Sequence, residues 1–207
     1  MAEPAKKRQQ KRGRERRAHI LKAAREILEE KDLEEISLAD VAARTGVPLS
    51  SLYHFYPSLQ RLLGELLPQF AVELLSALNQ YFETVQNETW QEDVDAVIQQ
   101  SAEFYRQHPG YQQLILSGKA PERIKRKDRR LDDLLLKGIH GPLNRKYALP
   151  DDPKLDEVFA FTLNIVELAF ALSVIRDGCI TEAAITEAQR AARAYLGTYI
   201  PEKLTLL

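Results

Sequence analysis

The chain has 207 residues, 44% of them hydrophobic, and a formal net charge of −1 at pH 7. This length allows one sizeable domain or a small domain joined to a larger one, and the near-neutral total excludes a chain that is basic throughout. The single cysteine, Cys179, excludes an intrachain disulfide, and the N-terminus lacks the apolar core of a secretory signal. We therefore expect a cytoplasmic protein.

The positive charge is concentrated at the N-terminus. Residues 1–17 hold eight Lys or Arg side chains against Glu3 and Glu15, a net charge of +6. Residues 1–12 are charged, rich in Gln and without an apolar period, which predicts a disordered basic tail. Such a tail indicates a polyanionic partner, and the alternative is a solvated segment that only aids solubility.

The apolar pattern along the rest of the chain is helical, which predicts an all-α fold. A first helix has one apolar face, and a second begins at a serine cap, Ser37, with Asp40 three positions later. Gly46 suits the left-handed conformation that ends this helix, and Pro48 suits the first turn of a third. The second and third helices, two short helices joined by a turn that contains glycine, predict a helix-turn-helix within a three-helix domain over residues 13–58.

A larger helical part is expected over residues 59–207. Its first helix should run from about 59 to 85, with a kink or break near Pro68, because proline removes one helical hydrogen bond. Further helices are predicted at about 90–107, 111–117, 122–146, 153–176 and 182–199. The helix after residue 153 is apolar over a length close to a membrane span. It also carries Glu167 among its apolar residues, so we expect a helix buried by protein on nearly all sides and no membrane.

The third predicted helix, residues 48–56, presents an unusual outer face. Leu52 and Tyr56 should point inward, whereas Leu49, Ser50 and Tyr53 point outward, flanked by Ser51 and His54. A face that is uncharged and rich in hydroxyl groups suits the major groove: an apolar residue meets a thymine methyl, and hydroxyls meet base edges or phosphates. The alternative is that the serines only cap the helix and that Tyr53 is a half-buried core residue.

Residues 18–63, AHILKAAREILEEKDLEEISLADVAARTGVPLSSLYHFYPSLQRLL, resemble the N-terminal domain of the TetR family of bacterial transcriptional regulators. The resemblance implies that Ser37, Ser51 and Tyr53 contact phosphates, and that Ala39, Leu49, Ser50 and His54 lie near base edges. One departure is Leu59, because the family usually has a phosphate-binding Lys there. We hypothesise that the basic tail compensates. The complete predicted DNA-contacting set is Arg16, Arg17, Ser37, Ala39, Arg44, Pro48, Leu49, Ser50, Ser51, Tyr53 and His54.

The apolar stripes of the last two predicted helices exceed what one small body needs, which favours a homodimer. The resemblance implies the same, with a dimer on a pseudo-palindromic DNA operator. The predicted interface residues are Leu155, Phe159, Thr162, Val166, Ala188, Ala192, Tyr195 and Tyr199. The alternative is that these stripes only bury one another within one chain.

The resemblance also implies a pocket for a small-molecule effector between the middle helices. Its predicted wall residues are Trp90, Phe104, Tyr105, Tyr111, Phe161, Glu167 and Phe170. Glu167 needs a partner or a proton at mid-helix, and it could contact a cationic or hydroxylated effector. Each of these residues could instead be ordinary core, and Glu167 could pair with a neighbouring Arg.

An enzyme is not expected. His19, His54, His108 and His140 fall on separate predicted elements, without the spacing of a metal site, and no glycine-rich phosphate loop or nucleophile elbow is present. We predict no catalytic residue, metal or cofactor. The predicted function is a sequence-specific transcriptional regulator, a repressor released from DNA by its effector. The competing interpretation is a helical adaptor that binds protein or RNA through its basic N-terminus.

Overall fold

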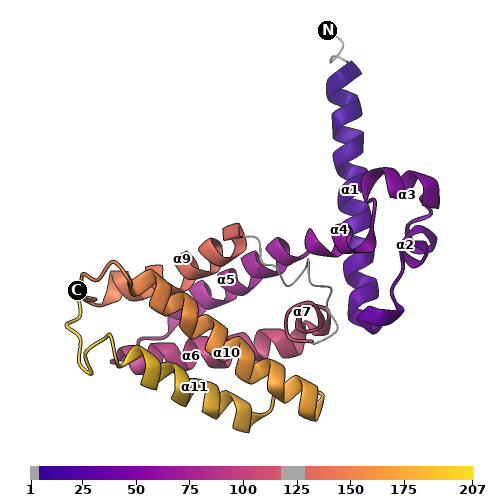
Figure 1. The fold of residues 1–207 in the computed structure, drawn as a ribbon. Helices are drawn as coiled ribbons and strands as arrows, with labels where there is room; N and C mark the ends of the chain where they lie inside the picture. The colour runs from indigo at the N-terminus through magenta and orange to yellow at the C-terminus, as the bar shows by residue number, and fades with distance from the viewer. Residues whose placement is uncertain (1–4, 118–128) are drawn as a thin grey trace.

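The computed structural model describes residues 5–117 and 129–207, which form helices and no β-strand beyond an isolated bridge between Tyr147 and Leu206. The N-terminal elements are α1 (Ala5–Glu30), the 3-10 helix η1 (Leu33–Glu35), α2 (Leu38–Thr45), α3 (Leu49–Phe55) and α4 (Leu59–Gly64). The later elements are α5 (Leu67–Thr84), α6 (Trp90–Gln107), α7 (Pro109–Ile115), α9 (Arg129–Lys146), α10 (Leu155–Asp177) and α11 (Glu182–Leu196). The all-α prediction is confirmed (Figure 1).

The elements from α1 to α4 form a small unit, which we call the head. Its core takes buried apolar side chains from all four helices, among them Ile20 of α1, Val41 of α2, Leu52 of α3 and Leu62 of α4, each with no exposed surface. Apolar residues at spacings of three and four place one face of each helix against the others. This packing determines which face of α3 is buried and which face is exposed to solvent.

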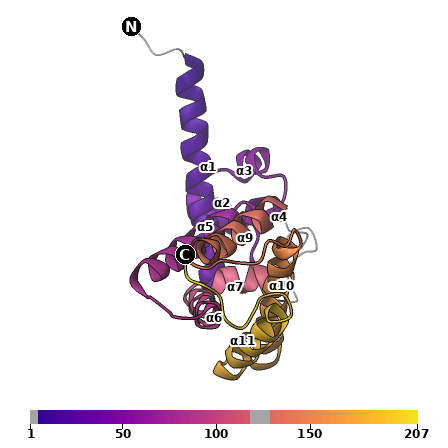
Figure 2. The ribbon, with the colours of Figure 1, turned by 90° about the vertical axis from the view of Figure 1, so that its left-hand side faces the viewer.

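Helix α1 extends far beyond the head. The tail that we expected to be disordered over residues 1–12 is helical from Ala5 onward, so that prediction is wrong for residues 5–12. The physical reason is that Lys, Arg and Gln are good helix formers, and a segment that continues a packed helix avoids the cost of nucleation. The N-terminal half of α1 therefore projects from the molecule as a helix (Figures 1 and 2).

The predicted interruption near Pro68 is present. The long helix expected over residues 59–85 is divided into α4 and α5, with Glu65 and Leu66 between them. At the break the Glu65 and Leu66 N–H groups donate to the Leu62 and Leu63 carbonyls, three residues back, at 3.1 and 3.0 Å. Pro68 has no N–H group to donate to the carbonyl four residues earlier, and its ring would clash with that carbonyl in a regular helix. The helix is therefore interrupted just before the proline.

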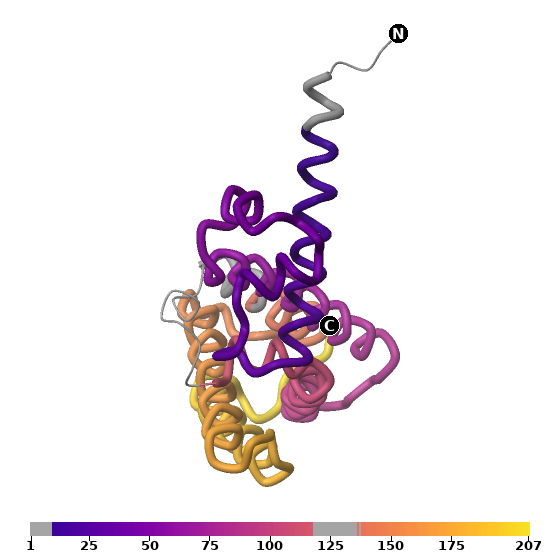
Figure 3. The backbone as a smooth tube through the Cα atoms, turned by 90° about the vertical axis from the view of Figure 1, so that its right-hand side faces the viewer, coloured from indigo at the N-terminus to yellow at the C-terminus, as the bar shows by residue number. Residues whose placement is uncertain are grey.

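The helices from α5 onward form a larger unit, which we call the body. Helices α5 and α9 pack together, α6 packs against α11, and α10 and α11 lie side by side (Figures 1 and 3). Helix α7 also packs against α1 and η1, so the head contacts the body through a second element besides the α4–α5 connection. The part of the predicted 122–146 helix before Arg129 lies outside the described residues.

Helix α10 does not lie fully inside the body. It is long and apolar enough to cross a membrane by length and composition, with a mean hydropathy of 2.1 over an 18-residue window, of which 33% is buried. The expectation of burial on nearly all sides is wrong for this single chain. Phe161, Leu168, Leu172 and Ile175, which follow one another along one face of the helix, are 55–66% exposed.

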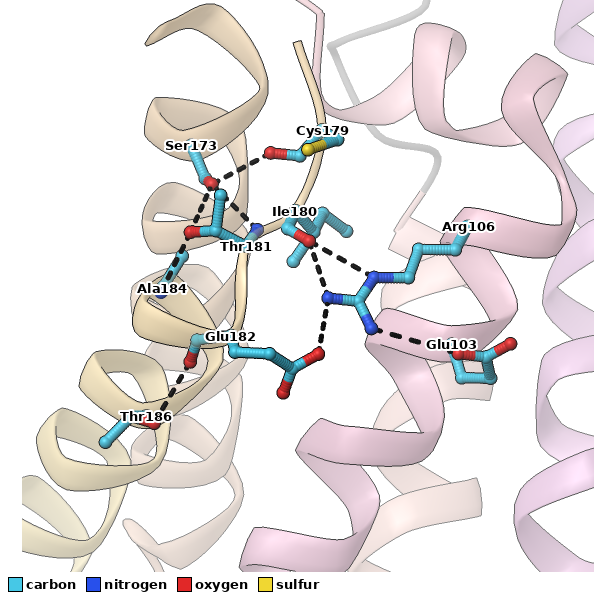
Figure 4. Close-up of polar contacts among 9 residues, drawn as sticks. All are labelled: Glu103, Arg106, Ser173, Cys179, Ile180, Thr181, Glu182, Ala184 and Thr186. Atoms are coloured by element: carbon cyan, nitrogen blue, oxygen red, sulfur yellow. Dashed lines mark hydrogen bonds and ion pairs between the residues drawn. The ribbon is translucent and has the colours of Figure 1, made fainter. Parts of the chain in front are cut away.

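The corner between α10 and α11 is fixed by polar contacts (Figure 4). The Ser173 hydroxyl donates to the Cys179 carbonyl at 2.9 Å and accepts from the Thr181 N–H at 3.1 Å. Across from it, the Arg106 guanidinium of α6 donates to the Ile180 carbonyl at 3.1 and 2.7 Å and pairs with Glu182 at 2.8 Å. The end of α6 is thereby tied to this corner.

Candidate DNA-binding site and effector cavity

Helix α2 begins at the predicted capping box. The Asp40 N–H donates to Ser37 Oγ at 3.2 Å, and the Ser37 N–H donates to Asp40 Oδ2 at 2.9 Å. Lys31 Nζ adds a bond to Asp40 Oδ1 at 2.8 Å, and Lys31 and Ser37 together lower the pKa of the Asp40 carboxyl well below its usual range. The cap satisfies N–H groups that the start of a helix leaves without partners. It leaves Ser37 and Ala39 on the surface.

The turn between α2 and α3 depends on Gly46. Its φ of 68° and ψ of 9° lie in the left-handed region, which glycine enters without steric cost. The Thr45 hydroxyl donates to the Val41 carbonyl at 2.7 Å and accepts from the Val47 N–H at 3.3 Å, which closes the turn. Helix α3 starts immediately afterwards, with Pro48 as its N-cap residue.

Helix α3 has the two faces expected from the sequence. Leu52 and Tyr56 are buried, whereas Leu49 is 39% and Tyr53 is 50% exposed. The outer surface also takes in Pro48, Ser50 and His54, which are exposed, and Ser51, which is half-buried. The structure thus brings the predicted uncharged, hydroxyl-bearing residues together on one protruding surface that is free of the protein's own core.

Two of the arginines predicted to contact DNA are engaged within the head. Arg44 pairs with Glu30 at 2.6 Å and lies 3.9 Å from Glu26, both on α1. Arg17 pairs with Glu65 at 2.5 Å. Both arginines therefore have intramolecular partners, in contrast to Arg16, which is exposed and makes no ion pair with the described residues.

Arg17 belongs to a network that sequence reasoning missed. Its Nε donates to Tyr56 Oη and to Glu65 Oε2, both at 3.1 Å, and the Tyr56 hydroxyl donates to Glu65 Oε2 at 2.9 Å. Burial raises the pKa of Tyr56 to about 12, and Glu65 holds the pKa of Arg17 above its usual value. The network joins α1, the residue that follows α3, and the α4–α5 break.

The body contains a cavity of about 70 Å³ lined by residues of α5, α6, α7, α9, α10 and α11. Four of the predicted wall residues line it: Tyr105, Tyr111, Glu167 and Phe170. Most of the other wall residues are aliphatic, with Ser101 and Thr162 adding hydroxyl groups. Space of this size holds several waters or a small apolar group.

The other three predicted wall residues lie elsewhere. Trp90 is buried and donates its Nε1–H to the Pro201 carbonyl at 2.9 Å. Phe104 is buried against His108, with ring centroids 4.3 Å apart. Phe161 is on the surface. Whether an aromatic residue of an amphipathic helix packs in the core or lines a cavity depends on how the neighbouring helices cross. The sequence pattern of a single helix does not show those crossings.

Two tyrosines form an aromatic wall of the cavity. The Tyr105 and Tyr111 rings stack with centroids 5.1 Å apart and an interplanar angle of 15°, and Tyr111 also stacks on Phe70 of α5 at 4.9 Å. Burial raises the pKa of both tyrosines, and the Glu167 carboxylate raises both further. The cavity therefore combines apolar walls with one carboxylate and two phenol groups.

The predicted dimer-interface residues lie mostly inside the subunit. Leu155, Phe159, Thr162 and Val166 of α10 and Ala188 and Ala192 of α11 are buried within this one chain, so their side chains are not available to a partner. Phe159, Thr162 and Val166 line the cavity instead. Tyr199 is exposed and Tyr195 half-buried, with their rings 5.5 Å apart.

Comparison with known proteins agrees with this geometry. Residues 20–66 match the bacterial regulatory proteins of the tetR family, and residues 88–200 match the tetracyclin repressor-like C-terminal domain. The chain is similar to the nucleoid occlusion factor SlmA of Pasteurella multocida, with 31% identity over 109 residues, or 52% of this chain and 53% of that protein. The chain thus matches that relative over about half its length.

Solved structures show the same fold. The chain resembles a TetR-family transcriptional regulator from Streptomyces coelicolor, with a TM-score of 0.68, 22% identity, and coverage of 89% of this chain and 99% of that one. It also resembles Thermus thermophilus FadR, a TetR-family repressor in complex with lauroyl-CoA, with a TM-score of 0.63, 17% identity, and coverage of 85% and 92%. RolR in complex with resorcinol gives a TM-score of 0.63, 16% identity, and coverage of 96% and 98%.

The helix-turn-helix head and a C-terminal domain match that spans more than half of the sequence lead to one conclusion. The chain belongs to the TetR family of bacterial DNA-binding transcriptional regulators, a family that is not enzymatic.

Proposed function

We propose that this regulator is a repressor that binds a pseudo-palindromic operator as a homodimer in the cytoplasm and is released from DNA by a small molecule in the body cavity. The observation that carries the proposal is the outer surface of α3. Leu49, Ser50 and Tyr53 protrude together, without a charge that would have to be desolvated, on a helix short enough to enter a major groove. Ser37, an exposed residue at the start of α2, supports the same duplex contact.

The cavity supports the effector part of the proposal. FadR and RolR, which share this fold, are both in complex with small molecules. In this chain the cavity of about 70 Å³ suits a small, mostly apolar effector, with Glu167, Tyr105 and Tyr111 supplying polar contacts. Conversion of Glu167 to Gln should therefore change the affinity for the effector.

A physical path leads from the cavity to the head. Tyr111 forms part of the cavity wall, and the N–H of the preceding residue, Gly110, donates to Glu29 Oε2 of α1 at 2.7 Å. Phe70, on which Tyr111 stacks, lies under the Arg25 guanidinium of α1, 4.4 Å from the ring centroid. An effector that displaces Tyr111 would shift α7 and α5 against α1 and lower the DNA affinity by a coupling energy of typically about 1–3 kcal/mol.

The homodimer is supported by the exposed apolar stripe of α10, which we define as Phe161, Leu168, Leu172 and Ile175. Contiguous apolar surface of this kind marks an interaction site in a soluble protein. A second copy related by a two-fold axis would cover it with the same residues and would carry a second α3. Two α3 helices about 34–36 Å apart would read successive major grooves on one side of a duplex.

Selection of binding sites from random duplex DNA tests the proposal. We expect the selected sequences to contain two inverted half-sites about one helical turn apart, and the protein to prefer them over a scrambled duplex at fixed salt. Ser50→Ala should relax the preference at one base position of each half-site, by about 1–3 kcal/mol for a direct contact. The matched control is Ser76→Ala, the same change on an exposed position of α5, which should leave the preference unaltered.

The selection also decides against the competing interpretation. Enrichment of no common sequence, with equal binding to duplex DNA and RNA, would support the helical adaptor and reject the regulator. A screen for small molecules that release the selected duplex then tests the effector part separately.

A further inference from the structure

We propose that residues 5–16 of α1, here called the arm, form a rigid second DNA-binding element that lies along the phosphate backbone of the duplex read by α3. We further propose that Arg17, Tyr56 and Glu65, here called the anchor, set the direction of the arm. The inference rests on the proposed function for its partner, and it adds a surface that lies outside the helix-turn-helix.

The part of the arm whose side chains are described carries positive charge that other described residues do not neutralise. The whole arm holds seven Lys or Arg residues against one acid, Glu15. Lys11, Arg12, Arg14 and Arg16 are exposed, and they make no ion pair with the described residues. Arg25 and Arg44, farther along the same part of the chain, pair instead with Glu73 and with Glu30. A concentration of unpaired cations favours a polyanion.

The position of the arm indicates that this polyanion is the duplex DNA contacted by α3. The arm leaves the head at the same end of the molecule as α3 and projects beyond it (Figures 1 and 2). Twelve helical residues span about 18 Å, roughly half a helical turn of duplex DNA. A duplex held against the outer surface of α3 would therefore meet the arm, and its phosphates would have cations within reach that α3 itself lacks.

The structure also explains why the arm is a helix and not a loose tail. An isolated helix of this length is marginal in water because nucleation is costly, but the arm continues α1, whose residues from Ile20 onward are packed in the head core. A helical arm loses less conformational freedom on binding than a disordered tail, so more of its electrostatic attraction remains as affinity.

The anchor lies where the arm meets the head. Arg17 is the first residue after the arm, and its guanidinium lies 5.2 Å from the centroid of the Tyr56 ring while it pairs with Glu65. Tyr56 is the residue that directly follows α3, and its hydroxyl donates to the same carboxylate at 2.9 Å. The anchor therefore connects the base of the arm to the end of α3, so that the two DNA-facing elements keep one relative orientation.

The salt dependence of operator binding tests the arm. The triple variant Lys11→Gln, Arg12→Gln, Arg14→Gln keeps good helix formers and removes three charges. We expect the slope of log K against log salt to become shallower by about 0.9 for each phosphate that the variant no longer neutralises, with an equal loss of affinity for operator and scrambled duplexes. The control triple variant Lys154→Gln, Arg190→Gln, Lys203→Gln removes the same charge from exposed positions of the body. Equal slopes for the two triple variants would overturn the proposal.

The direction in which Glu65→Gln changes the affinity for DNA tests the anchor. Glu65→Gln removes a negative charge near the DNA, so charge alone would tighten binding, as we expect for the matched head variant Glu35→Gln. If the anchor orients the arm, Glu65→Gln should instead bind the operator several-fold more weakly. Tyr56→Phe, which keeps the buried ring and removes only the hydroxyl, should weaken binding in the same direction. Tighter binding by Glu65→Gln, with unchanged binding by Tyr56→Phe, would reject the anchor.

These outcomes separate the arm from the proposed function. If the protein prefers its selected operator but the arm variant keeps the wild-type slope, the regulator stands and the arm is rejected. If no sequence preference exists but the arm variant still flattens the slope, the arm binds DNA and the sequence-specific regulator is rejected.

Discussion

At the scale of single residues, Asp93 shows how one buried carboxylate connects two segments that are more than 50 positions apart in the chain. It lies near the start of α6 with no exposed surface, and it accepts hydrogen bonds from Asn87 Nδ2 at 2.8 Å, Lys146 Nζ at 2.7 Å and Tyr147 Oη at 2.7 Å. The Lys146 carbonyl in turn accepts from the Leu207 N–H at 3.0 Å. A buried charge persists only with such partners, so this cluster fixes α9 and the C-terminal residues to α6.

We predict that Asp93→Asn lowers the free energy of unfolding by about 2 kcal/mol, because Lys146 loses its counter-ion and one amide hydrogen replaces an acceptor. Tyr147→Phe should cost about 1 kcal/mol, since it removes one neutral donor. Urea unfolding at one fixed protein concentration measures both changes. Asp151→Asn, an exposed control, should change stability by less than about 0.5 kcal/mol. A cost for Asp93→Asn equal to that of the control would contradict the role of the cluster.

Residues with local roles were predictable from the sequence, and residues with distant partners were not. Ser37 and Gly46 act within a few positions of the chain, so the capping box and the left-handed turn could be read directly. Arg17 was predicted to contact DNA, but its partner Glu65 lies 48 positions away and meets it only because α1 crosses the α4–α5 break. The arginine count indicated charge without indicating which arginines were already paired.

At the scale of elements, α7 of the body makes polar contacts with the residues of the head that directly follow α1. Gln113 of α7 donates to the Lys31 carbonyl at 3.2 Å and accepts from the Leu33 N–H at 2.6 Å. Gly110 permits this approach, because a Cβ atom there would lie 2.9 Å from Leu28 Cγ and 3.1 Å from Glu29 Cδ. Glycine is therefore needed at this position for close packing, not for its backbone angles.

We predict that Gly110→Ala and Gly64→Ala have opposite effects on stability. The first should destabilise the protein by about 1–3 kcal/mol, because the added methyl group pushes α7 away from the buried Leu28. The second places the same methyl group on α4, where nothing lies within 4 Å, and should stabilise by up to about 1 kcal/mol through helix propensity. Unfolding free energies decide the sign, and stabilisation by both variants would show that α7 is not held closely against α1.

The existence of most elements was predictable, but the roles of their faces were not. Caps at Ser37, Ser58, Thr89 and Thr181 define helix starts that the sequence contains. Helix α10 is apolar on both faces, so its pattern could not show which face lines the cavity and which is exposed. Val166 was assigned to a dimer interface and lies in the cavity wall, whereas Phe161 was assigned to the cavity and lies on the surface.

At the scale of the whole molecule, two surfaces of a single copy need a second copy. These are the exposed stripe on α10 and the outer surface of α3. The stripe leaves four large apolar side chains exposed to water, and α3, with seven residues, would reach only a few base pairs. The proposed two-fold dimer would meet both requirements, because it would cover the stripe and double the number of bases that are read. Assembly and operator affinity should therefore be lost together.

We predict that Leu168→Glu converts the protein to a monomer of 23.6 kDa, because two copies of a carboxylate would have to be buried against each other across the axis. Sedimentation equilibrium gives the mass, and the same samples should bind a complete operator no more tightly than an isolated half-site. The control is Val72→Glu, which introduces the same charge at an apolar side chain of α5 that is 56% exposed, close to the 60% of Leu168. The control should retain the dimer mass and the preference for the complete operator. A dimer that survives Leu168→Glu, with Val72→Glu dissociating instead, would place the interface on α5 and leave the stripe of α10 without its proposed partner.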